Sequence, residues 1–161
     1  MNDKAVFEIR HMTDRAVLED MLKLRWSEET VFIRGDVLHA AEVEGLGAYA
    51  DDRLQGVATW RIQGRILQLI TMNNITDRRG VSTALVEGMM ALGRKKDVSI
   101  LRAYLTNDNT DGMRFFQLRG FRIVAIFPGY VDIMRQLKPS LPLNGAHGIP
   151  MRDGIELEIE L

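Results

Sequence analysis

The sequence predicts an α+β fold: a mixed, mainly antiparallel sheet of six to seven strands with helices on both of its faces. Strand-like and helical patterns follow one another as β-α-β-β-β-α-β-α-β-β, which lacks the regular alternation of a doubly wound sheet. Three consecutive strand-like runs are joined by turn-type residues. With 161 residues the chain is large enough for one globular domain, and we expect a single domain, 1–161.

The first part of the chain predicts a strand, a helix and then a loop-rich segment. Residues 7–10 alternate between apolar and charged side chains, as a short strand does. Thr13 and Asp14 are typical of a helix start, and apolar residues follow them at helical spacing. From 26 to 47 the pattern is weaker, and within it we expect residues 36–41 to form one or two helical turns.

Three strand-like runs come next, at 46–50, 54–62 and 65–72. The residues at 51–53 and 63–64 separate these runs, and both connections are of the turn type. Because such short connections join antiparallel neighbours, the three runs predict an antiparallel meander.

The strongest helical pattern follows the polar stretch 73–80. From Val81 to Leu92, apolar residues recur on one face of a helix. A mostly apolar strand is expected at 98–105. This part of the chain therefore predicts a polar loop that opens directly into an amphipathic helix.

One more helix and strand precede the tail. Asn107, Asp108 and Asn109 offer N-caps for a helix that ends at Gly120, and residues 121–127 form a strand-like run. The tail, 128–154, carries all four prolines, so no continuous regular structure is expected before about Met151.

The last residues, 155–161, alternate Ile or Leu with Glu. This is the period of a strand that exposes one face to water. A final strand is therefore expected at the end of the chain.

Composition excludes several classes of function. The net charge of -1 and the absence of a dense Lys or Arg block argue against nucleic-acid binding. The chain has no cysteine, and His11, His39 and His147 stand far apart, so no metal site is predicted. No apolar signal sequence or run of 18 apolar residues occurs, and we expect a cytoplasmic protein without membrane association.

The junction between the third strand of the meander and the next helix has the features of an anion site. Free amides of the first helical turn and the positive end of the helix dipole attract anions. Gly80 allows close approach to the backbone, Arg78 and Arg79 add positive charge, and Ser82 and Thr83 carry hydroxyl donors. Taken alone, the same residues fit a turn followed by a solvated, basic helix start.

Two stretches of the sequence carry a family resemblance. The run Asp77-Arg78-Arg79-Gly80-Val81-Ser82-Thr83-Ala84-Leu85 resembles the pyrophosphate loop Gln/Arg-x-x-Gly-x-Gly/Ala of the GNAT superfamily of acyl-CoA-dependent N-acyltransferases. Asp77 and Ser82 depart from that pattern. Residues 109–121 resemble the same family's signature Asn-x-x-Ala-x-x-Phe-Tyr-x-x-x-Gly-Phe, with Phe116 in the place of the tyrosine.

The resemblance implies a GNAT-type N-acetyltransferase that binds acetyl-CoA, uses no metal and acts on an amine, as a monomer or a homodimer. The backbone around Ile70, Thr71 and Met72 would pair with the pantetheine, and an N–H there would stabilise the thioester oxyanion. Asn109 and Phe116 would lie beside the pantetheine and the sulfur. The implied diphosphate-binding residues are Arg78, Arg79, Gly80, Val81, Ser82 and Thr83.

The proton transfers remain open at the sequence level. Candidates for the base that deprotonates the amine are His39, Asp108 and water beside Gln68. Because Phe116 cannot protonate the departing sulfur, Tyr104, Tyr130 or water would have to do so. A thiolate has an ordinary pKa near ~8.5, so loss of this acid should slow transfer rather than abolish it.

Two other functions stay open. The phenylalanine at 116 and the absence of an obvious base fit a regulatory module that binds acyl-CoA without turnover, and a domain that only mediates protein contacts is a third possibility. The tail at 137–140 and 148–153, together with Arg34-Gly35 and His39, is similar to a bacterial subgroup of unassigned substrate. The acceptor is therefore not named by the resemblance.

Overall fold

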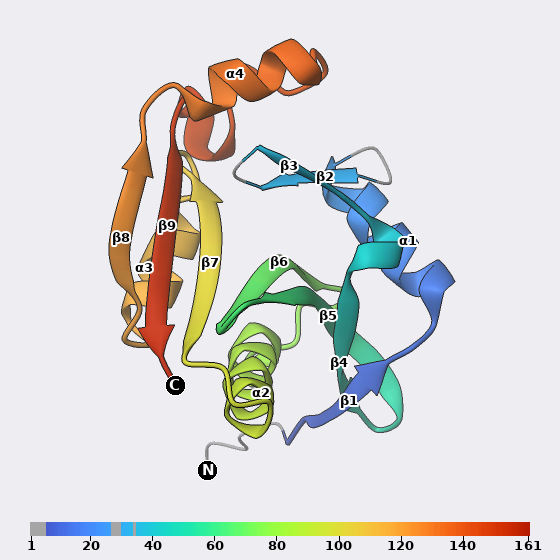
Figure 1. Cartoon of the computed structure of the whole chain (residues 1–161). Coiled ribbons are helices and arrows are strands. Elements are labelled where there is room, and N and C mark those ends of the chain that lie inside the picture. The colour runs from blue at the N-terminus through green and yellow to red at the C-terminus, as the bar shows by residue number, and fades with distance from the viewer. Residues whose placement is uncertain (1–5, 27–29, 34) are drawn as a thin grey trace. The chain divides into compact units, whose positions relative to one another are not determined.

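The computed structural model describes residues 6–26, 30–33 and 35–161 (Figure 1). The chain divides into two compact units, one formed by Met1–Leu101 with Leu161 and the other by Arg102–Glu160. Each unit is described separately below. The extent of a single domain over 1–161 stays a prediction.

The first unit contains a four-stranded antiparallel sheet in the order β1-β4-β5-β6, together with a two-stranded sheet, β2-β3. The expected meander is confirmed as β4, β5 and β6. The elements of this unit are β1 (Glu8–Met12), α1 (Arg15–Trp26), β2 (Thr30–Ile33), β3 (Asp36–His39), the 3-10 turn η1 (Ala40–Glu42), β4 (Glu44–Ala50), β5 (Arg53–Gln63), β6 (Ile66–Asn74) and α2 (Val81–Lys95).

The turn between β4 and β5 explains why these strands fold back so tightly. Asp51 and Asp52 both have positive φ, at 51° and 56°. Two successive residues with positive φ form the mirror-image turn whose twist matches that of antiparallel strands, and aspartate tolerates this conformation. Gly64, with φ 59°, serves the same purpose between β5 and β6.

The expectation of helical turns at 36–41 is wrong for most of that segment. Residues 36–39 form β3, which pairs with β2, and only 40–42 form a 3-10 turn. Gly35, with φ 84°, reverses the chain between the two strands. Leu38 is buried while its neighbours Val37 and His39 are exposed, which is the alternation of a strand. Arg34 lies outside the described residues.

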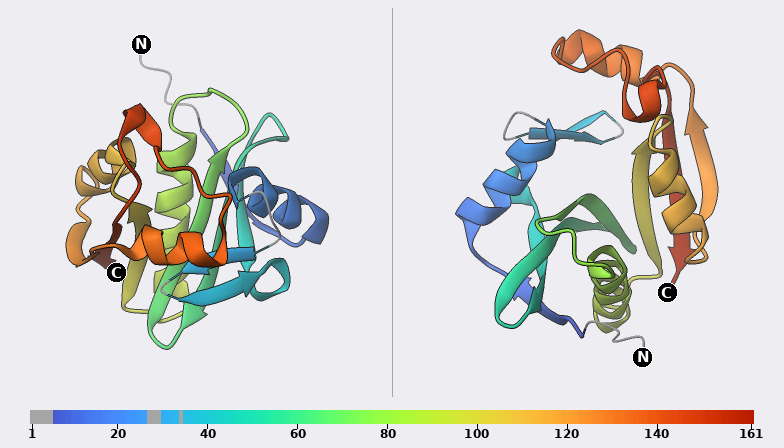
Figure 2. Two further views of the ribbon diagram at one scale, coloured as in Figure 1. Left: turned by 90° about the horizontal axis from the view of Figure 1, so that it is seen from above. Right: turned by 180° about the vertical axis from the view of Figure 1, so that it is seen from behind.

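Two helices cover opposite faces of the sheet in the first unit, as the fold class predicted (Figure 2). Val57 of β5 packs with Leu18 and Met21 of α1. A side chain at the preceding Gly56 would meet Val81 of α2. Because adjacent residues of a strand point to opposite faces, α1 and α2 lie on different sides of β5.

The second unit contains strands in the order β7-β9-β8, and β8 pairs antiparallel with β9. The helix predicted after Asn109 and the strands predicted at 121–127 and 155–161 are confirmed. The elements are β7 (Ile100–Thr106), α3 (Thr110–Gln117), β8 (Arg122–Phe127), α4 (Tyr130–Leu137), the 3-10 turn η2 (Ala146–Gly148) and β9 (Gly154–Glu160).

The sequence reading missed helix α4, which lies inside the proline-rich tail. Pro128 and Pro139 flank this helix without interrupting it, so its backbone ladder is intact. Gly129 precedes the helix with φ 72°, and its amide donates to the Asp153 carboxylate at 2.8 Å. The prolines therefore limit the helix to eight residues rather than prevent it.

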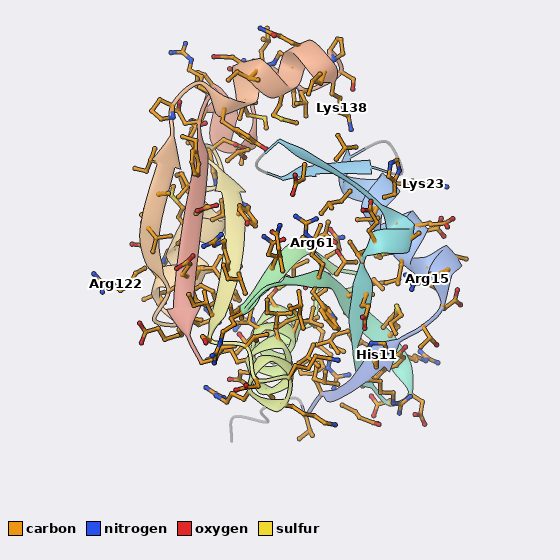
Figure 3. The ribbon with its side chains drawn as sticks, in the orientation of Figure 1. His11, Arg15, Lys23, Arg61, Arg122 and Lys138 are labelled. Carbon is orange, nitrogen blue, oxygen red and sulfur yellow. The ribbon has the colours of Figure 1, made fainter. Side chains whose placement is uncertain are left out.

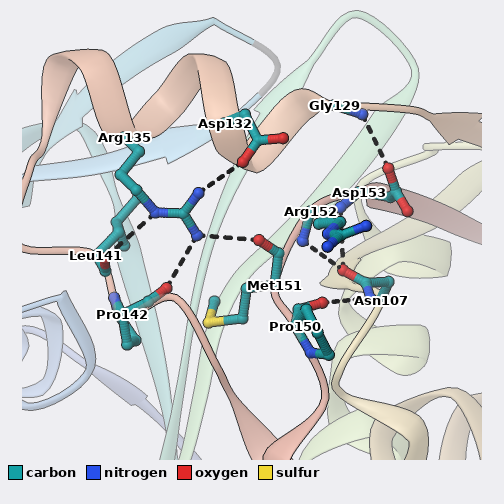
Figure 4. Close-up of polar contacts among 10 residues, drawn as sticks. All are labelled: Asn107, Gly129, Asp132, Arg135, Leu141, Pro142, Pro150, Met151, Arg152 and Asp153. Atoms are coloured by element: carbon teal, nitrogen blue, oxygen red, sulfur yellow. Dashed lines mark hydrogen bonds and ion pairs between the residues drawn. The ribbon is translucent and has the colours of Figure 1, made fainter.

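The tail after α4 is held by two polar side chains (Figure 4). The guanidinium of Arg135 donates to the carbonyl oxygens of Pro142 and Met151, both at 2.9 Å. The Asn107 side chain accepts from the amides of Arg152 and Asp153 at 2.8 and 3.0 Å. These bonds satisfy backbone groups that have no strand or helix partner, which fixes an irregular segment on the unit.

The expected fold class is confirmed. In the described part of the chain, the main sheet contains seven strands in mainly antiparallel pairing, and four α-helices accompany them. Among the same residues, no helix is both long and apolar enough to cross a membrane.

Leu85 provides a test of the packing between α2 and the sheet. This side chain is fully buried beside Gly56, so we expect Leu85→Ala to lower the free energy of unfolding by about 2–5 kcal/mol through lost burial and a residual cavity. Urea denaturation measures the change. Leu118→Ala is the matched control, since Leu118 is 74% exposed and its truncation should cost less than about 0.5 kcal/mol. Equal losses in both variants would contradict the described packing.

Candidate functional site

The loop between β6 and α2 is anchored to the neighbouring strand β5. The amides of Ile75 and Thr76 both donate to the Gln55 carbonyl oxygen, at 2.8 and 3.3 Å. The Thr76 hydroxyl donates to the Gln55 side-chain oxygen at 2.8 Å. Gln55 is buried, so this clamp sets where the chain leaves the sheet. In the sequence, the only sign of this contact was that Gln55 is a single amide side chain within a largely apolar run.

Gly80 sets the direction in which α2 begins. It is the residue before the helix and has φ 92° and ψ -6°, a left-handed conformation that glycine adopts without strain. The Ala84 amide donates to the Gly80 carbonyl at 2.9 Å. The amides of Val81 and Ser82 precede this bond and lie in the first turn, where the helix itself supplies no acceptor.

The two arginines of the loop differ in their surroundings. Arg78 lies 3.3 Å from the Asp51 carboxylate, and its guanidinium lies 5.7 Å from the centre of the Phe7 ring. Arg79 is exposed, and the described residues include no ion-pair partner for it. Arg79 is therefore the cation of this loop that is available to an external anion.

Ser82 also has a partner within the protein. Its hydroxyl donates to the Asn74 side-chain oxygen at 3.0 Å, which ties the start of α2 to the end of β6. This bond uses the only hydrogen of the hydroxyl. The backbone amide of Ser82, rather than its side chain, is thus the donor that this residue presents.

The electrostatics of the junction suit a diphosphate. The first turn of α2 contains no acidic residue, and its last turn carries Arg94 and Lys95, which complement the helix dipole. Positive potential at the opposite end comes from the first-turn amides together with Arg79. Since Gly80 has no side chain and is exposed, the backbone there is open to a ligand.

Strand β6 is irregular at the residues expected to pair with pantetheine. Trp60 pairs with Leu69 and Thr59 pairs with Thr71, so Ile70 is an extra residue in β6. The Thr71 amide donates to the Thr59 hydroxyl at 3.1 Å, and the two threonine hydroxyls are 2.6 Å apart. Because successive amides of a strand point to opposite edges, the Met72 amide faces away from β5.

Asn109 and Phe116 lie in the second unit, where both contribute to its folding. The Asn109 side chain caps α3 by accepting from the Gly112 amide at 2.9 Å. A side chain at Gly112 would collide with this cap. Phe116 is buried, and its ring lies edge-to-face with those of Phe115 and Phe121, with centres 5.2 and 5.0 Å apart.

The three catalytic candidates are divided between the two units. His39 is an exposed residue at the end of β3, in the first unit, and its amide donates to the Glu42 carboxylate at 2.8 Å. Tyr104 and Asp108 belong to the second unit. Their roles as base or acid stay predictions.

Asp108 has a clear structural partner. Its carboxylate accepts from the Ala146 amide at 2.9 Å, and the side chain is so close to Gly145 that any larger residue there would collide with it. Asp108 is only 6% exposed, and its second carboxylate oxygen has no hydrogen-bond partner among the described residues. The carboxylate therefore fixes the turn at 145–146 from inside the protein.

The second unit also contains a buried charged cluster on β7 and β9 that the sequence reading missed. The guanidinium of Arg102 contacts the carboxylates of Glu156 and Glu158. Burial alone would lower the pKa of Arg102, but hydrogen bonds to Tyr104 and Glu158 and the two negative charges raise it above its usual value. The predicted wet face of the last strand is therefore wrong at Glu156, which is 3% exposed.

No protein-family model matches the chain. Two relatives are the uncharacterized proteins YxbD and YdhI of Bacillus subtilis (strain 168), which are 28% identical over 137 residues and 27% identical over 140. The matches cover 84% and 86% of this chain and 86% and 88% of the relatives.

Solved structures of acetyltransferases are similar over nearly the whole chain. An IAA acetyltransferase from Bacillus cereus has a TM-score of 0.78 at 18% identity and covers 97% of this chain and 100% of its own. A Bacillus subtilis acetyltransferase in complex with CoA has a TM-score of 0.75 at 19% identity, covering 97% and 99%. A GNAT family acetyltransferase from Elizabethkingia anophelis with acetyl-CoA bound has a TM-score of 0.72 at 18% identity, covering 96% and 98%. The chain has the GNAT acetyltransferase fold.

Asp108 allows a structural role to be separated from a catalytic one. We expect Asp108→Ala to lower the free energy of unfolding by about 1–3 kcal/mol, because the Ala146 amide loses its hydrogen bond to a buried, charged acceptor. Asp108→Asn keeps a carbonyl oxygen and should lose less. Thermal and urea denaturation measure both changes.

Asp111→Ala serves as the control, since Asp111 bonds only to His147 among the described residues and both side chains are exposed. Its unfolding midpoint should hardly move. Wild-type stability in Asp108→Ala would show that the contact with Ala146 contributes nothing.

Proposed function

We propose that this protein is an N-acetyltransferase that moves an acetyl group from acetyl-CoA to an amine. The observation that carries the proposal is the junction of β6 and α2. There, the exposed Arg79, which has no ion-pair partner among the described residues, and the exposed, left-handed Gly80 directly precede the first turn of α2. The similar solved structures include acetyltransferases bound to CoA and to acetyl-CoA, which supports the same ligand here.

In this proposal the diphosphate of acetyl-CoA binds the amides of Val81 and Ser82 and the guanidinium of Arg79, with Thr83 in the same turn of the helix. Hydrogen bonds from charged and oriented donors to phosphate oxygens are about twice as strong as neutral ones. Arg78 contributes less, because its charge is shared with Asp51. The phosphates of acetyl-CoA would thus be bound at the start of α2, and its thioester end would be bound by β6.

The backbone of β6 would orient the thioester. The Thr71 amide is used within the sheet, so the Met72 amide is the donor that we assign to the thioester oxygen. In the reaction a bond forms between the amine nitrogen and the acetyl carbon, and the bond from that carbon to sulfur breaks. The amine loses a proton, for which His39 and Asp108 stay candidates, and the thiolate gains one, with Tyr104 as the candidate donor.

The proposal includes an amine acceptor as the second partner and no nucleic acid, membrane or metal. A monomer and a homodimer are both compatible with it. We also propose the cytoplasm as the location of this protein.

One observation favours a second function, namely acyl-CoA binding without turnover. Phe116 occupies the place of a tyrosine in the family signature, and it is buried against two other phenylalanine rings. This position therefore offers no proton to a departing thiolate. If free thiol is released from acetyl-CoA only when an amine is added, the protein is an enzyme. If acetyl-CoA binds tightly but no amine of a broad panel causes thiol release, the protein is a binding module.

The phosphate assignment is tested by deleting one charge at a time, either in the loop before α2 or in the last turn of this helix. We expect Arg79→Ala to weaken CoA binding about tenfold to a hundredfold, the loss of roughly 1.5–3 kcal/mol that a hydrogen bond to a charged group contributes. Arg78→Ala should weaken it less. Isothermal titration calorimetry at fixed ionic strength measures the three affinities.

Arg94→Ala is the matched control, because it removes the same charge from an exposed residue at the other end of the same helix. Its affinity for CoA should equal that of the wild type. If Arg79→Ala and Arg94→Ala bind CoA equally well, the diphosphate does not lie at the start of α2.

A further inference from the structure

Arg61 is a cation that the proposed function does not use. It projects from β5 in the first unit, and its side chain is 18% exposed. The Nε hydrogen is donated to the Gln68 side-chain oxygen at 2.5 Å, and Nη2 donates to the Asp36 carboxylate at 2.7 Å. Among the described residues, nothing accepts a hydrogen bond from Nη1.

Neutral groups of the sheet hold this guanidinium in place. Gln68 of β6 is 3% exposed, and its side-chain nitrogen donates to the Gln63 side chain at 3.1 Å. The Arg61 head therefore cannot turn about its long side chain as a surface arginine does. A fixed, planar guanidinium with unused donors is the group that proteins use to bind carboxylates with two parallel hydrogen bonds.

The guanidinium lies on the face of the sheet that α2 does not cover. Val57 packs against α1, and Thr59 and Arg61 follow it at intervals of two residues on the same face of β5. The β2–β3 hairpin lies on this side, since Asp36 of β3 reaches Arg61 (Figure 3). The diphosphate assigned to α2 and the guanidinium of Arg61 are thus on different faces.

Asp36 is the only described carboxylate that pairs with Arg61, and it is easily replaced. Its side chain is 53% exposed, next to the chain reversal at Gly35. Because the carboxylate of this pair is largely in water, the pair contributes little to stability, and a ligand carboxylate can take the place of Asp36. The buried Gln68 keeps the guanidinium oriented even when Asp36 turns to solvent.

Arg61 lies near the part of β6 that we assign to the thioester of the proposed substrate. Gln68, which holds Arg61, precedes the bulge residue Ile70 by two positions in β6, or roughly 7 Å at about 3.3 Å per residue. The backbone just beyond the bulge is the part of β6 that we assign to the thioester. A group bound by Arg61 is therefore within the length of a small molecule from that backbone.

We infer that Arg61 binds a carboxylate of the acceptor, so that the acceptor class is small amines that carry a carboxylate, such as amino acids. The inference rests on the proposed acetyl transfer and deepens it. Arg61 fixes one end of the acceptor, and its amine is then directed along β6. Asp36 occupies part of the guanidinium until the acceptor displaces it.

Matched pairs of amines test this assignment. Each pair consists of an amino acid and the amine that lacks its carboxylate: phenylalanine with phenethylamine, lysine with cadaverine, and methionine with 3-(methylthio)propylamine. Thiol release at saturating acetyl-CoA gives kcat/KM for each. We expect the acid to exceed its partner at least tenfold in the preferred pair, and Arg61→Gln to reduce kcat/KM for the acid about tenfold to a hundredfold.

Two further variants separate binding from folding. Arg53→Gln removes an exposed arginine at the other end of β5 and should leave the preference unchanged. Asp36→Asn breaks the ion pair but leaves Arg61 in place, so the KM for the acid should stay equal or fall. If Arg61 served only to hold the β2–β3 hairpin, Asp36→Asn would impair the enzyme as Arg61→Gln does, and the inference would be wrong.

Calorimetry with acetyl-CoA distinguishes a failure of the Arg61 assignment from a failure of the proposed acetyl transfer. Normal binding of acetyl-CoA by Arg61→Gln, together with the lost preference, supports the assignment. Intact binding with no preference for the acid in any pair, or with no acid acetylated, overturns the assignment alone. Failure of the wild-type protein to bind acetyl-CoA overturns the proposed function and the assignment with it.

Discussion

The proposed acetyl-CoA site depends on how the chain passes from β6 into α2. A helix cannot satisfy the amides of its own first turn, and Gly80 gives this helix a start that no side chain caps. The clamp from Gln55 to the loop determines where that start lies, because it fixes the last residues before the turn. A shift of one residue here would move the amides, Arg79 and the helix axis together.

Pairing between polar groups inside each unit determines which donors remain for ligands. Thr59 engages the amide of Thr71, and Gln68 engages the Nε hydrogen of Arg61. The donors that these pairs do not use are the amides of Val81 and Ser82 with Arg79 on one face, and Nη1 of Arg61 on the other. The sheet thus separates the proposed anion site at the helix start from a cation that is held against strands.

Much of the fold was predictable because its signals are local. The meander followed from three strand-like runs with two short turns, and α2 from apolar residues on one face. The helical turns predicted at 36–41 were wrong, because a short run with one buried position fits a helical turn as well as a strand. Only the pairing with β2 shows that residues 36–39 form a strand. Glu156 was expected in water, but it is buried beside Arg102, which reaches it from β7. The roles of Asp108 and Arg61 likewise depend on partners distant in sequence.

The most direct test of the central claim is a titration of uniformly 15N-labelled protein with CoA, followed by two-dimensional amide spectra. The account predicts that the largest shift changes fall at Arg79, Gly80 and the first turn of α2, with the amides of the last turn, at Arg94 and Lys95, nearly unchanged. Saturable binding that leaves the amides from Arg79 to Thr83 unmoved would contradict it.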